Sequence, residues 1–226
     1  MSKLSTRRRS NPGSLANQIY EMLRSAIVRS EIAPGEKLVE LEIAADMGTS
    51  QGPVREALQR LERDGLVQRQ ARRATVVTDT TTAEIYEFFA IRSTIESFAI
   101  RRAIANMTPE YEKMLRSLTE DMRRAGEAGD MAGLVEYDMD FHRLICEWSG
   151  SPVLVNAWMP LYSQIQRFIL QTHQHYFTDL GELADTHEPI LSAISRRDAD
   201  AAAQIIAEHV MLIWSRFEKS QGEEGK

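Results

Sequence analysis

Three histidines and one aspartate stand on apolar helical patterns in the second half of the chain. Asp138 and His142 are four residues apart, so their side chains emerge side by side from a helix. His187 and His209 each lie among isoleucine and leucine residues at helical spacing. A carboxylate with three imidazoles would suit a divalent ion such as zinc, nickel or manganese. Spacing alone leaves two interpretations open, a shared metal site or three separately satisfied core histidines.

Three further polar side chains are candidates for binding a small anion in the same region. Arg92, Gln164 and Arg167 carry hydrogen-bond donors that suit the carboxylate of an organic acid. The competing interpretation for each is a surface position with an ion pair. Cys146 lies one turn after His142, and we expect it to be a small buried hydrophobe.

A second set of chemistry-bearing residues follows one helix in the first third of the chain. Gln51, Arg55 and Gln59 recur at every fourth position, while Val54, Ala57, Leu58 and Leu61 share another face. Arginine and glutamine pair with guanine and adenine edges in the major groove. Ser50 is the expected N-cap, and a helix N-terminus favours phosphate. The pattern therefore predicts a helix that reads double-stranded DNA.

The elements that must position this helix form a helix-turn-helix pattern. A helix begins after Ser14, a second carries Ile43 to Met47, and Gly48 allows a tight turn into the third, which ends at Gly65. Residues 66–70 and 75–78 are predicted strands on either side of Arg72 and Arg73. We expect these arginines at a phosphate or in a minor groove, as the tip of a wing; a solvated charge run is the alternative.

The second part of the chain is helical by its periodicity. Pro160 predicts a kink or a division of its helix, and Pro189 a delayed helix start. Six antiparallel helices make a bundle large enough to enclose a cavity. The predicted fold is mainly α, an N-terminal winged helix-turn-helix followed by an all-helical antiparallel bundle. The expected helices are 83–106, 109–127, 131–149, 153–177, 186–196 and 198–219.

Composition excludes several classes of protein. The 226 residues are 43% hydrophobic, with only 12 glycines and 7 prolines, which argues against an all-β fold. No apolar stretch approaches the roughly 20 residues that span a bilayer, so no membrane segment is expected. A single cysteine and an N-terminus without an apolar signal segment favour the cytoplasm.

Charge is divided unevenly along the chain. Residues 1–78 hold 13 basic and 9 acidic side chains, whereas residues 79–226 hold 14 basic and 24 acidic ones. This division indicates that the basic part binds phosphate and that the acidic part has another function. The expected organisation is a flexible basic tail at 1–13, a DNA-binding domain at 14–78, a linker at 79–82, a helical effector-binding and dimerisation domain at 83–220, and a tail at 221–226.

The first third resembles the winged helix of GntR-type bacterial transcription regulators. The resemblance rests on Pro34 to Glu40, on Gly48 to Leu58, and on Gly65-Leu66-Val67. It implies that the positions of Gln51 and Arg55 contact DNA. Arginine is usual in the family where this chain has Gln51, and Ala74 replaces the family's wing glycine.

The remainder is similar to the FCD domain, the helical effector domain of the FadR-like branch of these regulators. Asp138-x-x-x-His142, His187 and His209 match its ligand pattern, and the run from Arg92 to Glu96 fits as well. The resemblance implies that these four side chains share one divalent ion, with zinc the first choice.

We expect a homodimeric transcription regulator, either a repressor or an activator, whose helical domain binds a divalent metal and a small organic or sugar acid that modulates binding to a pseudo-palindromic operator. The principal alternative is a metal-dependent hydrolase or oxygenase with a DNA-binding arm, although HExxH is absent. A purely structural DNA-binding dimer is a third. Against it stands the cost of burying unpaired histidines and carboxylates.

Overall fold

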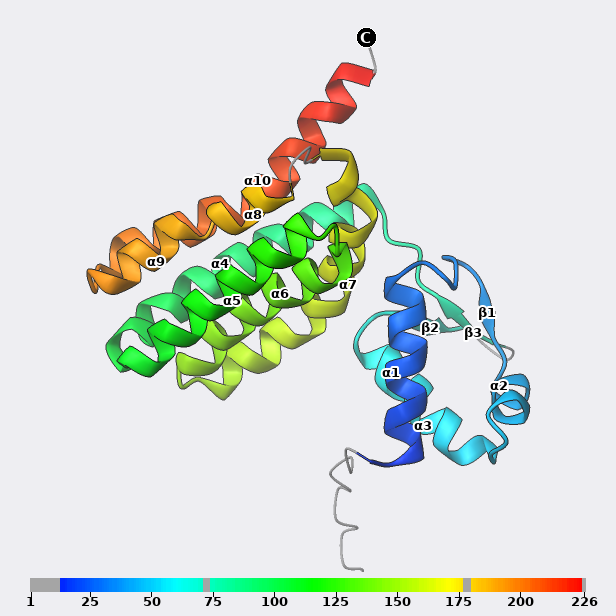
Figure 1. Cartoon of the computed structure of the whole chain (residues 1–226). Helices are drawn as coiled ribbons and strands as arrows, with labels where there is room; N and C mark the ends of the chain where they lie inside the picture. The colour runs from blue at the N-terminus through cyan, green and yellow to red at the C-terminus, as the bar shows by residue number, and fades with distance from the viewer. Residues whose placement is uncertain (1–12, 71–73, 177–179, 225–226) are drawn as a thin grey trace, which may run out of the picture. The chain divides into compact units, whose positions relative to one another are not determined.

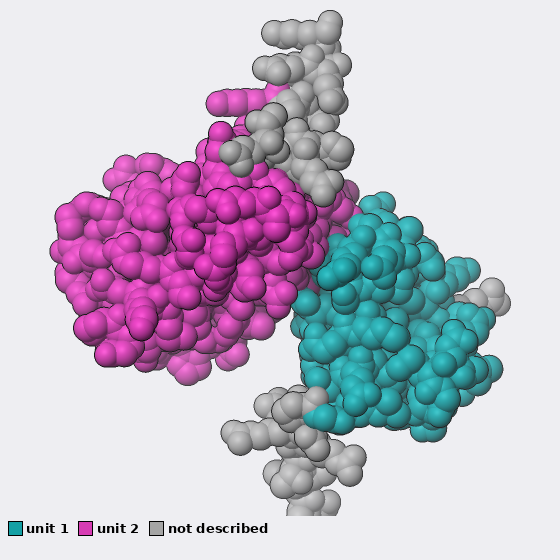
Figure 2. Space-filling model, viewed as in Figure 1, with its two compact units in different colours: residues 1–79 teal, residues 80–226 magenta. Residues whose placement is uncertain are grey.

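The computed structural model describes residues 13–70, 74–176 and 180–224. The chain divides into two compact units, residues 1–79 and 80–226 (Figure 2). The fold is mainly helical, as the sequence predicts, with a winged helix-turn-helix in the first unit and an all-helical second unit (Figure 1). Within the described ranges, no helix combines the length and apolar character needed to cross a bilayer.

The first unit contains a helix-turn-helix. Helices α1 (Leu15–Val28), α2 (Glu40–Asp46) and α3 (Gln51–Arg63) begin and end near the predicted positions. Gly48 adopts a φ of +60° between α2 and α3, a conformation that favours glycine. The Thr49 amide then donates to the Ala44 carbonyl at 2.9 Å. Ala44 and Val54 are buried where the two helices cross, so α3 presents its other face outward.

A small antiparallel sheet completes this unit. Strands β2 (Val67–Arg69) and β3 (Thr75–Val77) form the predicted hairpin, although each is shorter than expected. A third strand, β1 (Lys37–Leu38), was not predicted, and it pairs with β3 to give the order β1-β3-β2. The predicted wing residues Arg72 and Arg73 lie outside the described residues.

The second unit is a helical bundle (Figure 1). Its described part contains seven helices where six were expected, because the short α8 was not predicted. Pro160 does not divide α7, which runs through it without a break. The helices are α4 (Thr82–Asn106), α5 (Pro109–Glu127), α6 (Met131–Trp148), α7 (Pro152–Tyr176), α8 (Gly181–Asp185), α9 (Glu188–Ser195) and α10 (Ala199–Glu224).

Two helix boundaries of this unit differ from the prediction by two residues or more. Helix α9 begins at Glu188 instead of Thr186, because Pro189 occupies the first turn and His187 becomes the N-cap residue. Helix α10 continues past the expected end at Lys219 and ends at Glu224. The first of these differences matters for the site, since it fixes the place of His187.

Helix α4 lies at the centre of the unit, in contact with α6, α7 and α10. Its start is stabilised by a capping box in which Thr81 and Glu84 bond each other's backbone amides. The inward faces of these helices are apolar, with Phe89, Phe141 and Trp158 nearly inaccessible to solvent. Polar side chains inside this core therefore need partners or a ligand.

Candidate functional site

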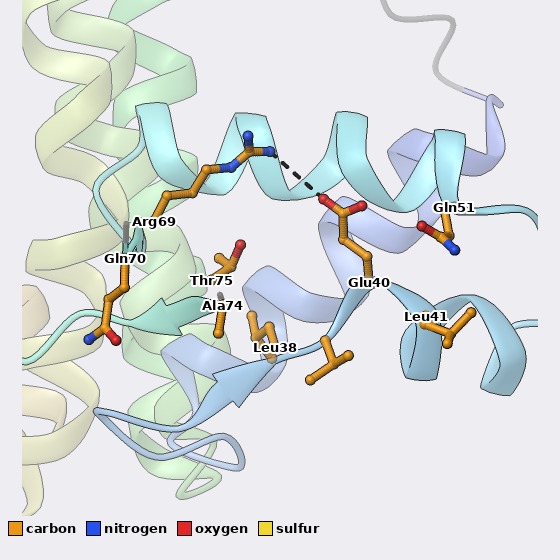
Figure 3. A pocket seen from close by; sticks show the side chains of 9 residues that line it. Leu38, Glu40, Leu41, Gln51, Arg69, Gln70, Ala74 and Thr75 are labelled. Atoms are coloured by element: carbon orange, nitrogen blue, oxygen red, sulfur yellow. Dashed lines mark ion pairs between the residues drawn. The ribbon is translucent and has the colours of Figure 1, made fainter. Parts of the chain in front are cut away.

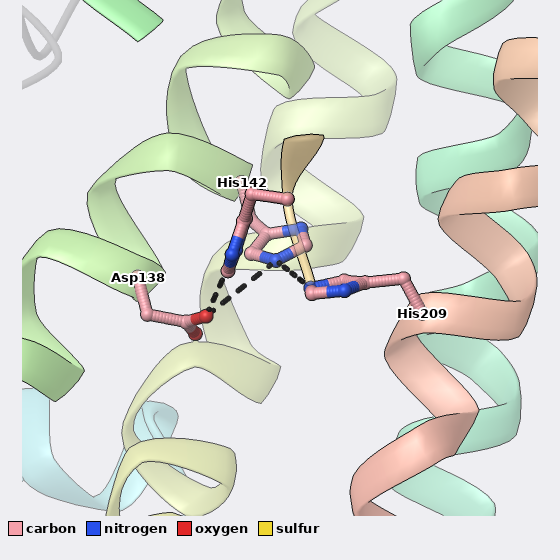
Figure 4. A group of neighbouring side chains, drawn as sticks. Asp138, His142 and His209 are labelled. Atoms are coloured by element: carbon pink, nitrogen blue, oxygen red, sulfur yellow. Dashed lines mark hydrogen bonds and ion pairs between the residues drawn. The ribbon is translucent and has the colours of Figure 1, made fainter. Parts of the chain in front are cut away.

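Asp138, His142, His187 and His209 lie together inside the second unit. Each offers one ligand atom, and these atoms all lie within 4.8 Å of one another (Figure 4). Asp138 and His142 come from α6, His187 from the start of α9, and His209 from α10. Asp138 is 7% exposed, while His142 and His187 are fully buried. The fold thus brings together residues from distant parts of the sequence, since Asp138 and His209 are 71 positions apart.

Hydrogen bonds at Nδ1, on the side of the ring away from the cluster, fix the orientation of two of the imidazoles. His187 Nδ1 lies 3.0 Å from the Leu183 carbonyl oxygen, and His142 Nδ1 lies 2.5 Å from Glu96 Oε2. Because each partner accepts, Nδ1 carries the proton and Nε2 keeps its lone pair. This orientation by a carbonyl or carboxylate is typical of metal-ligating histidines.

The lone pairs converge on the centre of the cluster. His142 Nε2 is 3.2 Å from His209 Nε2, and His187 Nε2 is 3.2 Å from Asp138 Oδ1. Asp138 Oδ2 and His209 Nδ1 are buried without a hydrogen-bond partner among the described residues. Facing lone pairs and an unsatisfied carboxylate oxygen are costly in a buried site, and a cation would satisfy them.

The electrostatic environment also suits a cation. Burial, together with the neighbouring histidines, holds the pKa of His209 well below its usual value, and burial lowers the pKa of His142. Burial alone would raise the pKa of Asp138, but His187 and His142 lower it overall. Neutral imidazoles and an ionised carboxylate are the forms that bind metal. The donor set therefore fits a divalent ion.

Glu96 is a buried member of this site that was not predicted as a functional residue. Its Oε1 accepts from Arg92 Nε at 2.6 Å and from Trp158 Nε1 at 2.7 Å, and its Oε2 accepts from His142. Burial opposes ionisation, yet Arg92 and His142 hold the pKa of Glu96 at about 2. In the sequence, the four-residue spacing of Arg92 and Glu96 indicated that these two side chains could pair on one helix. The contact of Glu96 with His142 of α6 had no such signal.

The three residues predicted to bind an anion are buried and not at the surface. Arg92 is 1% exposed, and its Nη2 has no hydrogen-bond partner among the described residues. Its charge contributes to the low pKa of Asp138. Gln164 and Arg167 are each 5% exposed on α7, and Gln164 accepts from Thr80 at 3.4 Å. Cys146 is buried, and burial raises the pKa of its thiol.

In the first unit, α3 exposes the three residues that were predicted to face DNA. Gln51, Arg55 and Gln59 are exposed, whereas the apolar residues on the opposite face are fully buried. Ser50 is the N-cap residue of α3, but its side chain makes no capping hydrogen bond. The first turn of α3 therefore keeps backbone amides available to a ligand such as phosphate.

Arg55 is held by Glu40, a residue that was not predicted to belong to this surface. Its Nε and Nη2 both donate to Glu40 Oε2, at 3.0 and 2.9 Å, while 53% of the arginine side chain remains exposed. Arg69 from the wing approaches the other oxygen of Glu40 at 3.9 Å (Figure 3). Glu40 and Arg69 border a groove of about 450 Å³ between α2, α3 and the wing, which Gln51 and Gln70 also line.

Two family models match the chain, one on each unit. Residues 15–77 match "Bacterial regulatory proteins, gntR family", and residues 87–211 match "FCD domain". The chain therefore belongs to the GntR family of bacterial transcription regulators and carries an FCD domain. This is a DNA-binding regulator and not an enzyme.

Similar proteins cover nearly the whole chain. The "HTH-type transcriptional repressor RspR" of Escherichia coli is 30% identical over 90% of this chain and 89% of that protein. The "Probable D-xylose utilization operon transcriptional repressor" of Paenarthrobacter nicotinovorans is 28% identical over 91% and 89%. The solved structure of E. coli McbR/YncC superposes with a TM-score of 0.77 at 24% identity, covering 92% and 99% of the two chains. That structural likeness concerns the fold.

Proposed function

We propose that this regulator is a homodimeric repressor whose operator binding is modulated by a small organic or sugar acid, bound beside a divalent metal in the helical unit. The observation that carries the proposal is the buried cluster of three imidazoles and a carboxylate, next to Arg92, whose Nη2 has no partner among the described residues. FCD domains often bind metal. RspR and the D-xylose operon protein named above are repressors by name, which supports the direction of control.

Asp138, His142, His187 and His209 would hold the ion, with zinc the first choice and nickel or manganese as alternatives. Such an ion would supply a Lewis-acidic point for a carboxylate oxygen of the effector. Arg92 adds a positive charge in the same buried region, and its Nη2 has no hydrogen-bond partner within the part of the chain that the structure describes. Gln164 and Arg167, which are buried on α7, are further proposed effector contacts.

On the DNA side, Arg55 and Gln51 are proposed to contact base edges, with Gln59 further along the same helix face. Arg72 and Arg73 are proposed to contact a phosphate or the minor groove. Ser50 and the first turn of α3 would lie near a phosphate. Glu40 restricts the guanidinium of Arg55 before DNA is present, so less side-chain freedom is lost on binding.

The proposed dimer has a candidate surface on α4. Ile91 and Phe98 are two turns apart on this helix, 48% and 58% exposed, with exposed Thr94 between them. A second copy of the chain would remove this apolar surface from water. Light scattering on the full chain and on an Ile91→Glu variant tests this point. A parent protein with the mass of one chain would contradict it.

Elemental analysis of the purified protein tests the metal, and it should be run on the parent, Asp138→Ala and His209→Ala. We expect about one divalent ion per parent chain and strong depletion in both variants. Thermal-shift screening of carboxylic acids with and without zinc then identifies the acid, with sugar-derived acids tested first. The proposal fails if the parent never retains a divalent ion without chelators, or if both variants bind metal and acid as well as the parent.

A further inference from the structure

Glu96 contacts three different side chains at once inside the second unit. Its carboxylate lies on α4, accepts from Trp158 of α7 and His142 of α6, and pairs with Arg92 one turn earlier on α4. The glutamate is 0% exposed. A buried glutamate that served only to neutralise Arg92 would not need the contact of 2.5 Å with a histidine.

We propose that Glu96 is the positioning residue that prepares His142 for metal by fixing its tautomer. A carboxylate without a proton can only accept, so Nδ1 of His142 must donate. The single proton of the neutral ring is then on Nδ1, and the lone pair of Nε2 faces the centre of the cluster. This inference rests on the proposed metal site, but its first test needs no metal.

The hydrogen bonds of Glu96 make glutamine a sharp probe of this role. Both Arg92 Nε and Trp158 Nε1 donate to Oε1, which a glutamine oxygen can replace. The amide nitrogen of Glu96→Gln then stands where Oε2 accepted, and it donates to His142 Nδ1. The ring must move its proton to Nε2, and the lone pair that a metal needs is lost. Size and the other two hydrogen bonds are preserved.

The first test is the tautomer of His142 in the metal-free, full-length protein, read from long-range ¹H–¹⁵N NMR spectra. The signal is assigned by its loss in His142→Ala. We expect a proton on Nδ1 in the parent and on Nε2 in Glu96→Gln. A parent histidine protonated on Nε2 overturns the proposal, and that result does not depend on whether the variant folds.

The second test is the affinity for zinc alone, measured by competition with a chelator of known affinity. Glu96→Gln should bind zinc about 10- to 100-fold more weakly than the parent, the usual effect of losing an outer-shell partner. Glu136→Gln, on the exposed face of α6, makes the same charge change and should bind as the parent does. A folded Glu96→Gln with parental zinc affinity overturns the proposal.

The two tests separate this inference from the proposed function. If the parent binds no zinc, the metal site fails, while the tautomer of His142 still decides whether Glu96 fixes the position of the proton on that ring. If the parent binds zinc and Glu96→Gln binds it equally, the metal site stands and the role of Glu96 fails. Glu96→Asp keeps the acceptor, so it should retain the Nδ1 proton and bind zinc more tightly than Glu96→Gln.

Discussion

Zinc should stabilise the helical unit by an amount that a melting experiment resolves. Its proposed ligands come from α6, from the start of α9 and from α10, so the ion would bridge segments that separate on unfolding. An ion held 100-fold above its dissociation constant adds about 2.7 kcal/mol to the free energy of unfolding. One kcal/mol shifts the midpoint by about 2–4 °C at this domain size, so the expected rise is about 5–11 °C.

Tryptophan fluorescence reports on this unit alone. All three tryptophans of the chain, Trp148, Trp158 and Trp214, lie in residues 80–226, so their signal follows the helical unit and not the DNA-binding unit. The protein is stripped with a chelator, dialysed and melted with and without zinc. The same heating rate makes the two midpoints comparable, and a second scan after cooling checks that unfolding is reversible, which the conversion to free energy requires.

His209→Ala is the decisive variant, because it removes one proposed ligand from a half-buried position. Its metal-free form should melt close to the metal-free parent, while the zinc-dependent rise is lost. Glu136→Gln, exposed on α6, should keep the full rise. A full rise in His209→Ala would refute the reasoning. So would a parent that retains zinc by elemental analysis but gains no stability from it.

Three other changes test the DNA contacts and the packing. Arg55→Ala should lower operator affinity about 5- to 150-fold at fixed salt, because about 1–3 kcal/mol of contact with base edges is lost. An unchanged affinity would show that Arg55 does not contact the bases. Arg73→Ala should weaken specific and non-specific DNA alike and reduce the salt slope by about 1, unlike a base-selective loss. Gly126→Ala should cost about 1–3 kcal/mol in urea unfolding, because its Cβ would lie 2.9 Å from the Leu180 backbone. Gly52→Ala, whose Cβ meets nothing closer than 3.9 Å, is the control, and an equal loss there would contradict the clash.

Long periodic segments made most of the helices predictable, whereas short elements were missed. Helix α8 has five residues, too few to show a periodic pattern. Strand β1 has two residues, and it exists because Lys37 and Leu38 pair with Val76 and Thr75 far along the chain. Helix α8 was therefore missed because it is short, and β1 because its pairing partner is distant in the sequence.

The site shows the same division between local and distant information. The spacing of Asp138 and His142 follows from one helix, but their convergence with His187 and His209 came from the resemblance to a family. Glu96 was missed because its partner His142 is 46 positions away on another helix. Glu40 was missed for a similar reason, since it meets Arg55 across the turn between α2 and α3.

Helix α4 connects the two proposed activities by its position. Arg92 lies ten residues after Thr82, the first residue of α4, which is about 15 Å along the helix axis. Before that helix, Thr80 donates to Gln164 of α7 at 3.4 Å, and Thr81 caps α4. Farther along, the bond from Trp158 to Glu96 joins the same two helices at 2.7 Å. If an acid bound at Arg92 shifts α4 against α7, at least one of these two contacts must change, and the one between Thr80 and Gln164 lies just before α4, where the chain arrives from the DNA-binding unit. Such a shift alters operator binding only if the acid binds one α4–α7 arrangement more tightly than the other.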